Sequence, residues 1–161
     1  MHYLKDQVTF PNLGNKGRLG NQLFQIAATI STAIDHNFGC AFPDWEYNKF
    51  LKNPIIEQSK LTSSIISYNT TDYYTEQSFR YNNIKLPDTG SKSVLEDVKV
   101  YALDGYFQSR KYFENHETFI REQFQPSQEI INIVYRRHYP LVSTHSCAIH
   151  VRRGDYVDLS Y

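Results

Sequence analysis

The hydrophobic positions of the chain form two kinds of pattern, short apolar or β-branched runs and stripes at helical spacing. Runs of the first kind predict strands, and the helical stripes fall between them. Such an alternation along one chain is typical of an α/β protein with a largely parallel sheet. The strands are expected at residues 7–13, 38–43, 65–68, 98–106 and 144–151.

The clearest helical stripe begins at Asn21, a suitable N-cap residue, and continues to Ile34. Weaker helical patterns lie at 46–52, 74–80 and 111–124. A further helix is expected to start at Ser127, to carry Arg136, Arg137 and His138 in its last turn, and to end at Pro140. The apolar positions of the first helix are Leu23, Ile26, Ala27, Ile30 and Ile34.

Three glycines at intervals of three, Gly14, Gly17 and Gly20, separate the first strand from the first helix. The spacing is neither that of a dinucleotide-binding loop nor that of a P-loop. A glycine loop followed by a helix N-terminus presents backbone N–H groups to an anion. A tight turn that merely packs the helix on the strand is the alternative, and Arg18 is equally consistent with a solvated loop charge.

The last apolar run leads directly into Arg152 and Arg153, after which Gly154 and Asp155 turn the chain. In an open α/β sheet, ligands bind at the carboxyl ends of the strands. Guanidinium groups match phosphate oxygens in a bidentate way and stay charged. We therefore expect an anionic ligand at this strand end, beside His150.

Charge and cysteine content exclude several classes of function. Seventeen basic and seventeen acidic residues give zero formal net charge, which disfavours a nucleic-acid or membrane-surface binder. Cys40 and Cys147 lie in apolar runs and are expected to be buried free thiols, with no metal or redox motif. With neither a signal peptide nor a membrane-length apolar run, the sequence predicts a soluble cytoplasmic protein; membrane or Golgi association would require a longer product.

Three motifs together resemble one enzyme family. His150-x-Arg152-Arg153-x-Asp155 is similar to the HxRRxD motif of fucosyltransferases that use GDP-fucose. Residues 17–22 resemble the G-x-x-G-N-Q segment that opens the α-1,2-fucosyltransferase family, glycosyltransferase family 11. Residues 105–113, with GYFQS and then KYF, resemble a stretch of its bacterial or viral members. The three occur in the order found in the family.

The resemblance implies a fold of two Rossmann-like lobes, called GT-B. Residues 1–140 would be the N-terminal lobe with a connecting helix. Residues 141–161 would supply the opening strand and the HxRRxD motif of the nucleotide-sugar-binding lobe. Since family members are considerably longer, we expect the chain to contain the N-terminal part only.

The resemblance also implies a reaction, the transfer of L-fucose from GDP-fucose to a galactose hydroxyl of a glycan acceptor. The α-1,2 link would form with inversion, without a metal and without a cofactor. Fixed positive groups would stabilise the charge that develops on the leaving diphosphate. The implied catalytic residues are Arg152, Arg153 and Asp155; the donor-binding residues are His150, Arg152, Arg153, Arg18, Gly20, Asn21 and Gln22; and Tyr106 and Gln108 are further cleft candidates.

Two other interpretations remain open. The chain would be a catalytically incomplete remnant that still binds a nucleotide sugar or glycan, or a phosphate-handling enzyme or nucleic-acid binder that uses the arginine pair. The second ranks low because the sequence has no P-loop. Asp155 is also consistent with simple pairing to an arginine, and no residue stands out as the general base.

Overall fold

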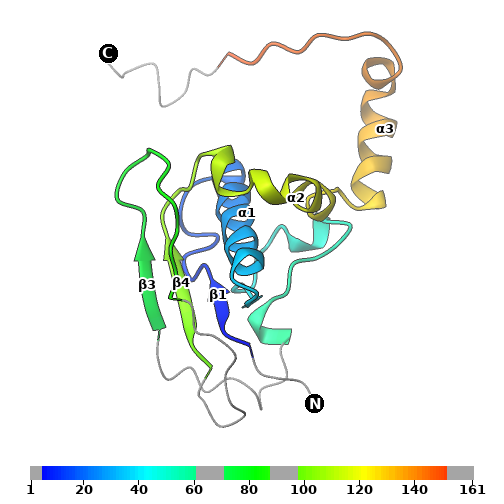
Figure 1. Cartoon of the computed structure of the whole chain (residues 1–161). Helices are drawn as coiled ribbons and strands as arrows, with labels where there is room; N and C mark the ends of the chain where they lie inside the picture. The colour runs from blue at the N-terminus through cyan, green and yellow to red at the C-terminus, as the bar shows by residue number, and fades with distance from the viewer. Residues whose placement is uncertain (1–4, 61–70, 88–97, 152–161) are drawn as a thin grey trace. The chain divides into compact units, whose positions relative to one another are not determined.

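The structure is a computed structural model that describes residues 5–60, 71–87 and 98–151. It divides into two units, residues 1–127 and residues 128–161. The first unit contains a parallel four-stranded sheet in the order β2-β1-β4-β3 (Figure 1). Its strands are β1 (Gln7–Thr9), β2 (Gly39–Cys40), β3 (Thr71–Thr75) and β4 (Val100–Asp104). The α/β class with a parallel sheet is thus confirmed.

Helix α1 (Leu19–Asp35) joins β1 to β2 and packs on both strands. Its N-cap is Arg18, three residues before the predicted N-cap Asn21, which lies in the first turn of the helix. The predicted stripe is confirmed at three buried positions, whereas Ile34 is 41% exposed. The buried face is wider than the stripe because polar side chains share it, and its members are Gln22, Gln25, Ile26, Ala27, Ala28, Thr29, Ile30, Ser31, Thr32 and Ala33.

Strand β4 lies between β1 and β3 and is the most deeply buried strand. Its first four residues are at most 3% exposed, as expected of a parallel strand that is covered on both faces. The ring of Tyr101 stacks on that of Phe38, with 5.4 Å between the ring centroids and 9° between the ring planes. Leu103 joins Val8 of β1 and Phe10, which directly follows β1, in the main core. Burial of each large apolar side chain stabilises the fold by about 1.5–3 kcal/mol.

The remaining elements of the first unit are short. They are η1 (Asn48–Phe50), η2 (Gln58–Lys60), η3 (Arg110–Tyr112), η4 (Glu114–His116) and α2 (Glu117–Gln123). The helix expected at 46–52 is therefore one 3-10 turn, and the element at 111–124 is two such turns followed by α2.

The helix predicted at 74–80 is wrong, because Tyr74 and Thr75 belong to β3 and residues 76–80 are not helical. Tyr74 pairs with Leu103 of β4, and pairing with a buried strand decides the conformation of a segment rich in Tyr and Thr. The strand predicted at 65–68 lies outside the described residues.

The second unit contains helix α3 (Gln128–Val142). Its start agrees with the prediction, but it continues past Pro140 instead of ending there. The backbone leaves helical geometry at His138, with φ −129° and ψ 23°, two residues before the proline. This kink accommodates a ring that lacks an N–H group and crowds the preceding turn.

The strand predicted at 144–151 is wrong: residues 145–151 have no regular secondary structure. Ile149 is 86% and Val151 71% exposed. A strand requires a neighbour that accepts and donates its backbone hydrogen bonds, and no described strand pairs with this segment. The domain boundary after residue 140 stays a prediction.

Both cysteines are free thiols, but only one is covered. Cys40 at the end of β2 is half-buried, and burial raises the pKa of its thiol to about 11. Cys147 is exposed, so the expectation that it is buried is wrong, because its segment joins no sheet. Among the residues that the structure describes, no helix is both long and apolar enough to cross a membrane.

Candidate functional site

The parallel strands β1, β3 and β4 end at the same edge of the sheet. Three loops follow them there, at residues 10–18, 76–80 and 105–109, and helix α1 begins beside them (Figure 1). This is the edge at which open α/β sheets bind ligands. The sequence-predicted residues of the first unit all lie on these segments.

Two of the three glycines in the first loop are required by its geometry. Gly14 and Gly17 have φ of +89° and +79°, a region that side chains rarely adopt. A Cβ on Gly17 would also meet the side chain of Asn21. Gly20 differs, because it lies in the first turn of α1 and a Cβ there would meet nothing within 4 Å. Neither backbone conformation nor packing requires a glycine at this position. Its missing side chain leaves open space at the N-terminal end of α1.

Gln22 holds the glycine loop from inside the molecule. Its side chain is buried, and its amide nitrogen donates to the carbonyl oxygen of Gly17 at 3.0 Å. Its amide oxygen accepts the indole N–H of Trp45 at 2.7 Å. The structure therefore places this predicted donor-binding residue behind the loop, where it positions the backbone.

Gln25 ties the loop after β1 to the loop after β4. It is fully buried, and its amide nitrogen donates to the carbonyl oxygens of Lys16, at 3.0 Å, and Gly105, at 3.4 Å. Sequence reasoning missed this role, although a glutamine amid the apolar positions of α1 is the kind of signal that reveals a buried polar tether.

The side chains of Asn21 and Gln108 meet at the sheet edge. The Gln108 amide nitrogen donates a hydrogen bond of 2.5 Å to the Asn21 amide oxygen. Two segments that are 87 residues apart, one in each of two motifs, are thereby joined. Arg18 is exposed just before them, and helix α1 has neither a capping side chain nor an acidic residue in its first turn. The positive end of its dipole is not offset by its own sequence.

Glu76, directly after β3, organises the loop that carries Gln108. Its Oε2 accepts the backbone N–H groups of Tyr106, at 2.7 Å, and Phe107, at 2.9 Å, and its Oε1 accepts the hydroxyl of Tyr112 at 3.2 Å. A Cβ on Gly105 would lie 2.5 Å from Cβ of Glu76, so only glycine allows this approach. Sequence reasoning missed Glu76, because a helix was expected there.

The same loop contains a strained residue. Phe107 has φ of +50°, uncommon for a bulky side chain, and its carbonyl accepts the N–H of Ser109 at 2.8 Å in a tight three-residue turn. Its ring is fully buried against Phe10 and Tyr112. Such strain persists where surrounding contacts over-determine the backbone, and it clusters at functional sites.

An ion pair lies at the end of β4. Lys16 Nζ is 2.9 Å from Asp104 Oδ1, which also accepts the Asn12 amide at 3.3 Å. The hydrogen bond from Lys16, helped by that from Asn12, lowers the pKa of Asp104 despite partial burial. Lys16 Nζ also lies 5.4 Å from the centroid of the Tyr106 ring. Sequence reasoning did not identify Lys16 and Asp104 as a pair.

The remaining predicted site residues lie outside the first unit in the sequence. His150 is exposed and belongs to the second unit. Arg152, Arg153 and Asp155 lie outside the described residues.

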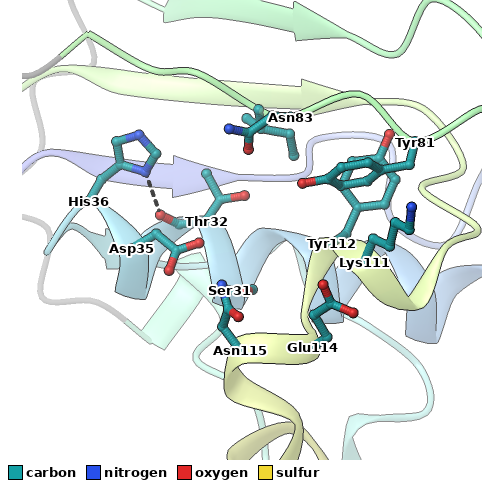
Figure 2. A pocket seen from close by; sticks show the side chains of 11 residues that line it. Ser31, Thr32, Asp35, His36, Tyr81, Asn83, Lys111, Tyr112, Glu114 and Asn115 are labelled. Atoms are coloured by element: carbon teal, nitrogen blue, oxygen red, sulfur yellow. Dashed lines mark hydrogen bonds between the residues drawn. The ribbon is translucent and has the colours of Figure 1, made fainter.

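A separate hollow of about 60 Å³ lies beside the C-terminal half of α1 (Figure 2). It is far smaller than the roughly 300 Å³ or more of ordinary ligand pockets. Its one histidine, His36, has both ring nitrogens engaged, with the Thr32 carbonyl and the Leu86 N–H. Tyr112 lines the hollow and also donates to Glu76 of the sheet edge. We therefore take the sheet edge as the candidate site.

Comparison with known families identifies the family of the chain. The model of Glycosyl transferase family 11 matches residues 1–161. The chain belongs to glycosyl transferase family 11. Searches of curated proteins and of solved structures returned no match. Family 11 is a fucosyltransferase family, whose members act on a nucleotide-sugar donor and a glycan acceptor, so the resemblance carried by the three motifs is confirmed.

Proposed function

We propose that this family 11 chain binds GDP-fucose at the carboxyl edge of its sheet and transfers L-fucose to a galactose hydroxyl of a glycan. The observation that carries the proposal is the hydrogen bond between Asn21 and Gln108. It brings two motifs of the family together at the edge where an α/β sheet takes its ligands. The α-1,2 linkage, the inversion and the second lobe of a GT-B fold belong to the same proposal.

The helix end suits the diphosphate of such a donor. Backbone N–H groups in the first turn of α1 have no partner inside the helix and favour an anion. Gly20 leaves space in which a phosphate oxygen can approach the backbone. Lys16 adds a positive charge nearby, which Asp104 partly offsets.

In the proposed reaction the acceptor oxygen forms a bond to the anomeric carbon, the bond from that carbon to the phosphate oxygen breaks, and GDP leaves. The acceptor hydroxyl gives its proton to a base. Following the resemblance, we assign Arg152 and Arg153 to the leaving diphosphate, and His150 and Asp155 to orienting these arginines or contacting the sugar. Charge stabilisation at the leaving group lowers the barrier without a metal.

Two carboxylates of the described edge are poor candidates for the base. Glu76 accepts three hydrogen bonds from the loop after β4 and from Tyr112, so its two oxygens are already engaged within the protein and do not face a substrate. The lowered pKa of Asp104 makes it a weaker proton acceptor. Both are better described as residues that position the loops.

Calorimetry with GDP-fucose and with GDP, followed by a transfer assay on lactose, tests the proposal. We expect wild-type binding that is weakened in Asn21→Ala and in Arg152→Ala. Gln128→Ala, which changes an exposed amide in the second unit, is the matched control and should bind normally. Failure of the folded wild-type chain to bind either nucleotide would overturn the proposal.

A donor-binding protein that does not catalyse transfer is the second candidate. It is favoured by the irregular backbone of residues 145–151, because the HxRRxD motif then begins in a segment that pairs with none of the described strands. Binding of GDP-fucose without transfer to any galactoside would support it. Transfer that depends on Arg152 would exclude it.

A further inference from the structure

An exposed aromatic side chain lies against the candidate site. Phe79 is 75% exposed, on the loop that follows β3. Its ring centroid is 5.9 Å from that of Tyr106, and the two planes are inclined by only 32°. A phenyl ring exposed to this extent keeps apolar surface in water, so covering it with a ligand is favourable. The pair therefore presents a small apolar surface at the ligand-binding edge of the sheet.

The Tyr106 side of this surface is anchored to the loop that carries Phe79. Glu76, three residues before Phe79, holds the backbone of Tyr106 through a hydrogen bond of 2.7 Å. The loops after β3 and β4 are therefore joined at the point where the two rings meet. Anchored aromatic side chains lose little further conformational entropy when a ligand covers them.

Polar groups border the same rings. The ammonium group of Lys16 lies 5.4 Å from the Tyr106 ring, and Gln108 follows two residues later with its amide directed to Asn21. An aromatic surface beside amide and ammonium donors matches a hexose, which has an apolar C–H face and a rim of hydroxyl groups. A phosphate group has no apolar face to place on the rings.

We propose that Phe79 and Tyr106 form the platform on which the galactose ring of the acceptor stacks. The inference rests on the proposed function, because it places the acceptor next to the donor diphosphate at the start of α1. Phe79 then determines acceptor affinity and takes no part in donor binding. The guanine base of the donor is the other flat group that would fit these rings, and the test separates the two.

Saturation-transfer NMR with lactose and the whole chain measures this contact without any need for turnover. We expect saturation of the galactose ring protons in the wild type. It should fall at least about fivefold in Phe79→Ala, as loss of an aromatic contact predicts. Phe79→Trp should retain it. Phe119→Ala, which removes a 50% exposed phenyl ring of α2, is the matched control and should behave as the wild type.

Calorimetry with GDP on the same variants completes the test. Unchanged GDP affinity in Phe79→Ala together with lost lactose saturation supports the platform. Loss of GDP affinity with lactose saturation retained would assign the rings to the guanine base and overturn it. Equal lactose signals in Phe79→Ala and Phe119→Ala would also overturn it. If the wild type binds lactose but neither GDP nor GDP-fucose, the proposed donor function fails while the sugar platform stands.

Discussion

The indole N–H of Trp45 donates a buried hydrogen bond of 2.7 Å to the side-chain oxygen of Gln22. The same glutamine binds the carbonyl of Gly17 with its amide nitrogen. Through these two contacts, the segment after β2 supports the glycine loop at the sheet edge from behind. The family motif G-x-x-G-N-Q thus contains a residue whose task is to hold the loop that the other residues form.

Gln22→Leu is expected to destabilise the protein, because it keeps the apolar part of the side chain but leaves the Trp45 indole N–H unpaired inside the core. An unsatisfied buried donor costs about 1–3 kcal/mol. Urea unfolding of the wild type, Gln22→Leu, Trp45→Phe and the double variant measures this. The double variant should be less destabilised than the sum of the two single variants. Strict additivity would show that the two side chains do not interact.

Replacing Gly17 and Gly20 by alanine should change the stability of the protein in opposite directions. Gly17→Ala places a Cβ at φ +79° and against Asn21, so we expect a loss of at least about 1 kcal/mol of unfolding free energy. Gly20→Ala places a Cβ in open space within a helix, and should stabilise the chain by about 0.4–1 kcal/mol. Thermal unfolding compares them directly.

The Gly20→Ala variant also separates an effect on stability from an effect on GDP binding. If Gly20 is kept for the approach of a phosphate, Gly20→Ala should bind GDP more weakly although it is more stable. Normal GDP affinity in this variant would contradict the ligand-approach explanation of Gly20 and would leave the fold itself unaffected.

How far the sequence predicts this structure depends on how local each signal is. Helix α1 and strand β4 are long apolar patterns, and both were predicted within a few residues. The predictions were wrong at the end of β3, where a helix was expected, and at 144–151, where the expected strand does not form. The presence of a strand depends on a partner that the local pattern does not contain. Gly17 and Asn21 were named from the motif, and the structure brings Asn21 to Gln108.

The contacts that hold the site together were harder to foresee. Glu76 and Lys16 act on loops about 30 and 90 residues away in the chain, through hydrogen bonds that depend on the order of the strands in the sheet. The position of Gln22 behind the loop depends on Trp45, which no spacing rule connects to it. Strand order and side-chain burial are properties of the whole fold, so a motif could indicate the site without showing which residues face the ligand.

Glu76→Ala is expected to loosen the loop that carries Gln108, because two backbone N–H groups lose their acceptor. Hydrogen bonds to a charged group are worth about 1.5–3 kcal/mol, so a loss of that size is expected in urea unfolding. Glu76→Gln keeps one oxygen that can accept both N–H groups. Its loss of unfolding free energy should be less than half that of Glu76→Ala. A Gln variant as unstable as the Ala variant would show that charge, and not the acceptor geometry, is what the loop requires.

The two cysteines should differ in their rate of reaction with a thiol reagent. Burial raises the pKa of Cys40 from 9.0 to about 11, which lowers its thiolate fraction at pH 8 by about 100-fold. Cys147 is exposed, so we expect one fast and one slow thiol in a stopped-flow reaction with a disulfide reagent. Cys147→Ser should remove the fast phase and Cys40→Ser the slow one. Two thiols of equal rate would contradict the burial of Cys40.

The ion pair between Lys16 and Asp104 predicts a small dependence of stability on pH. The pKa of Asp104 is lower in the folded chain than its ordinary value of 3.8, first because of the hydrogen bond from Lys16. A lowered folded-state pKa means that the stabilisation is complete above about pH 4 and is lost as the pH falls through the folded value. Since both side chains are more than a quarter exposed, the effect should stay below about 1 kcal/mol.

Unfolding of the wild type and of Asp104→Asn, measured from pH 6 down to pH 2.5 at low ionic strength, tests this. The stability advantage of the wild type should shrink below pH 4, and it should be smaller throughout in 0.5 M salt, because salt screens exposed charges. Glu114→Gln, an exposed carboxylate on η4, is the matched control and should leave the wild-type profile between pH 4 and 2.5 largely intact. An advantage that persists unchanged at pH 2.5 would mean that Asp104 holds the edge through hydrogen bonds that Asn cannot make, and not through its charge.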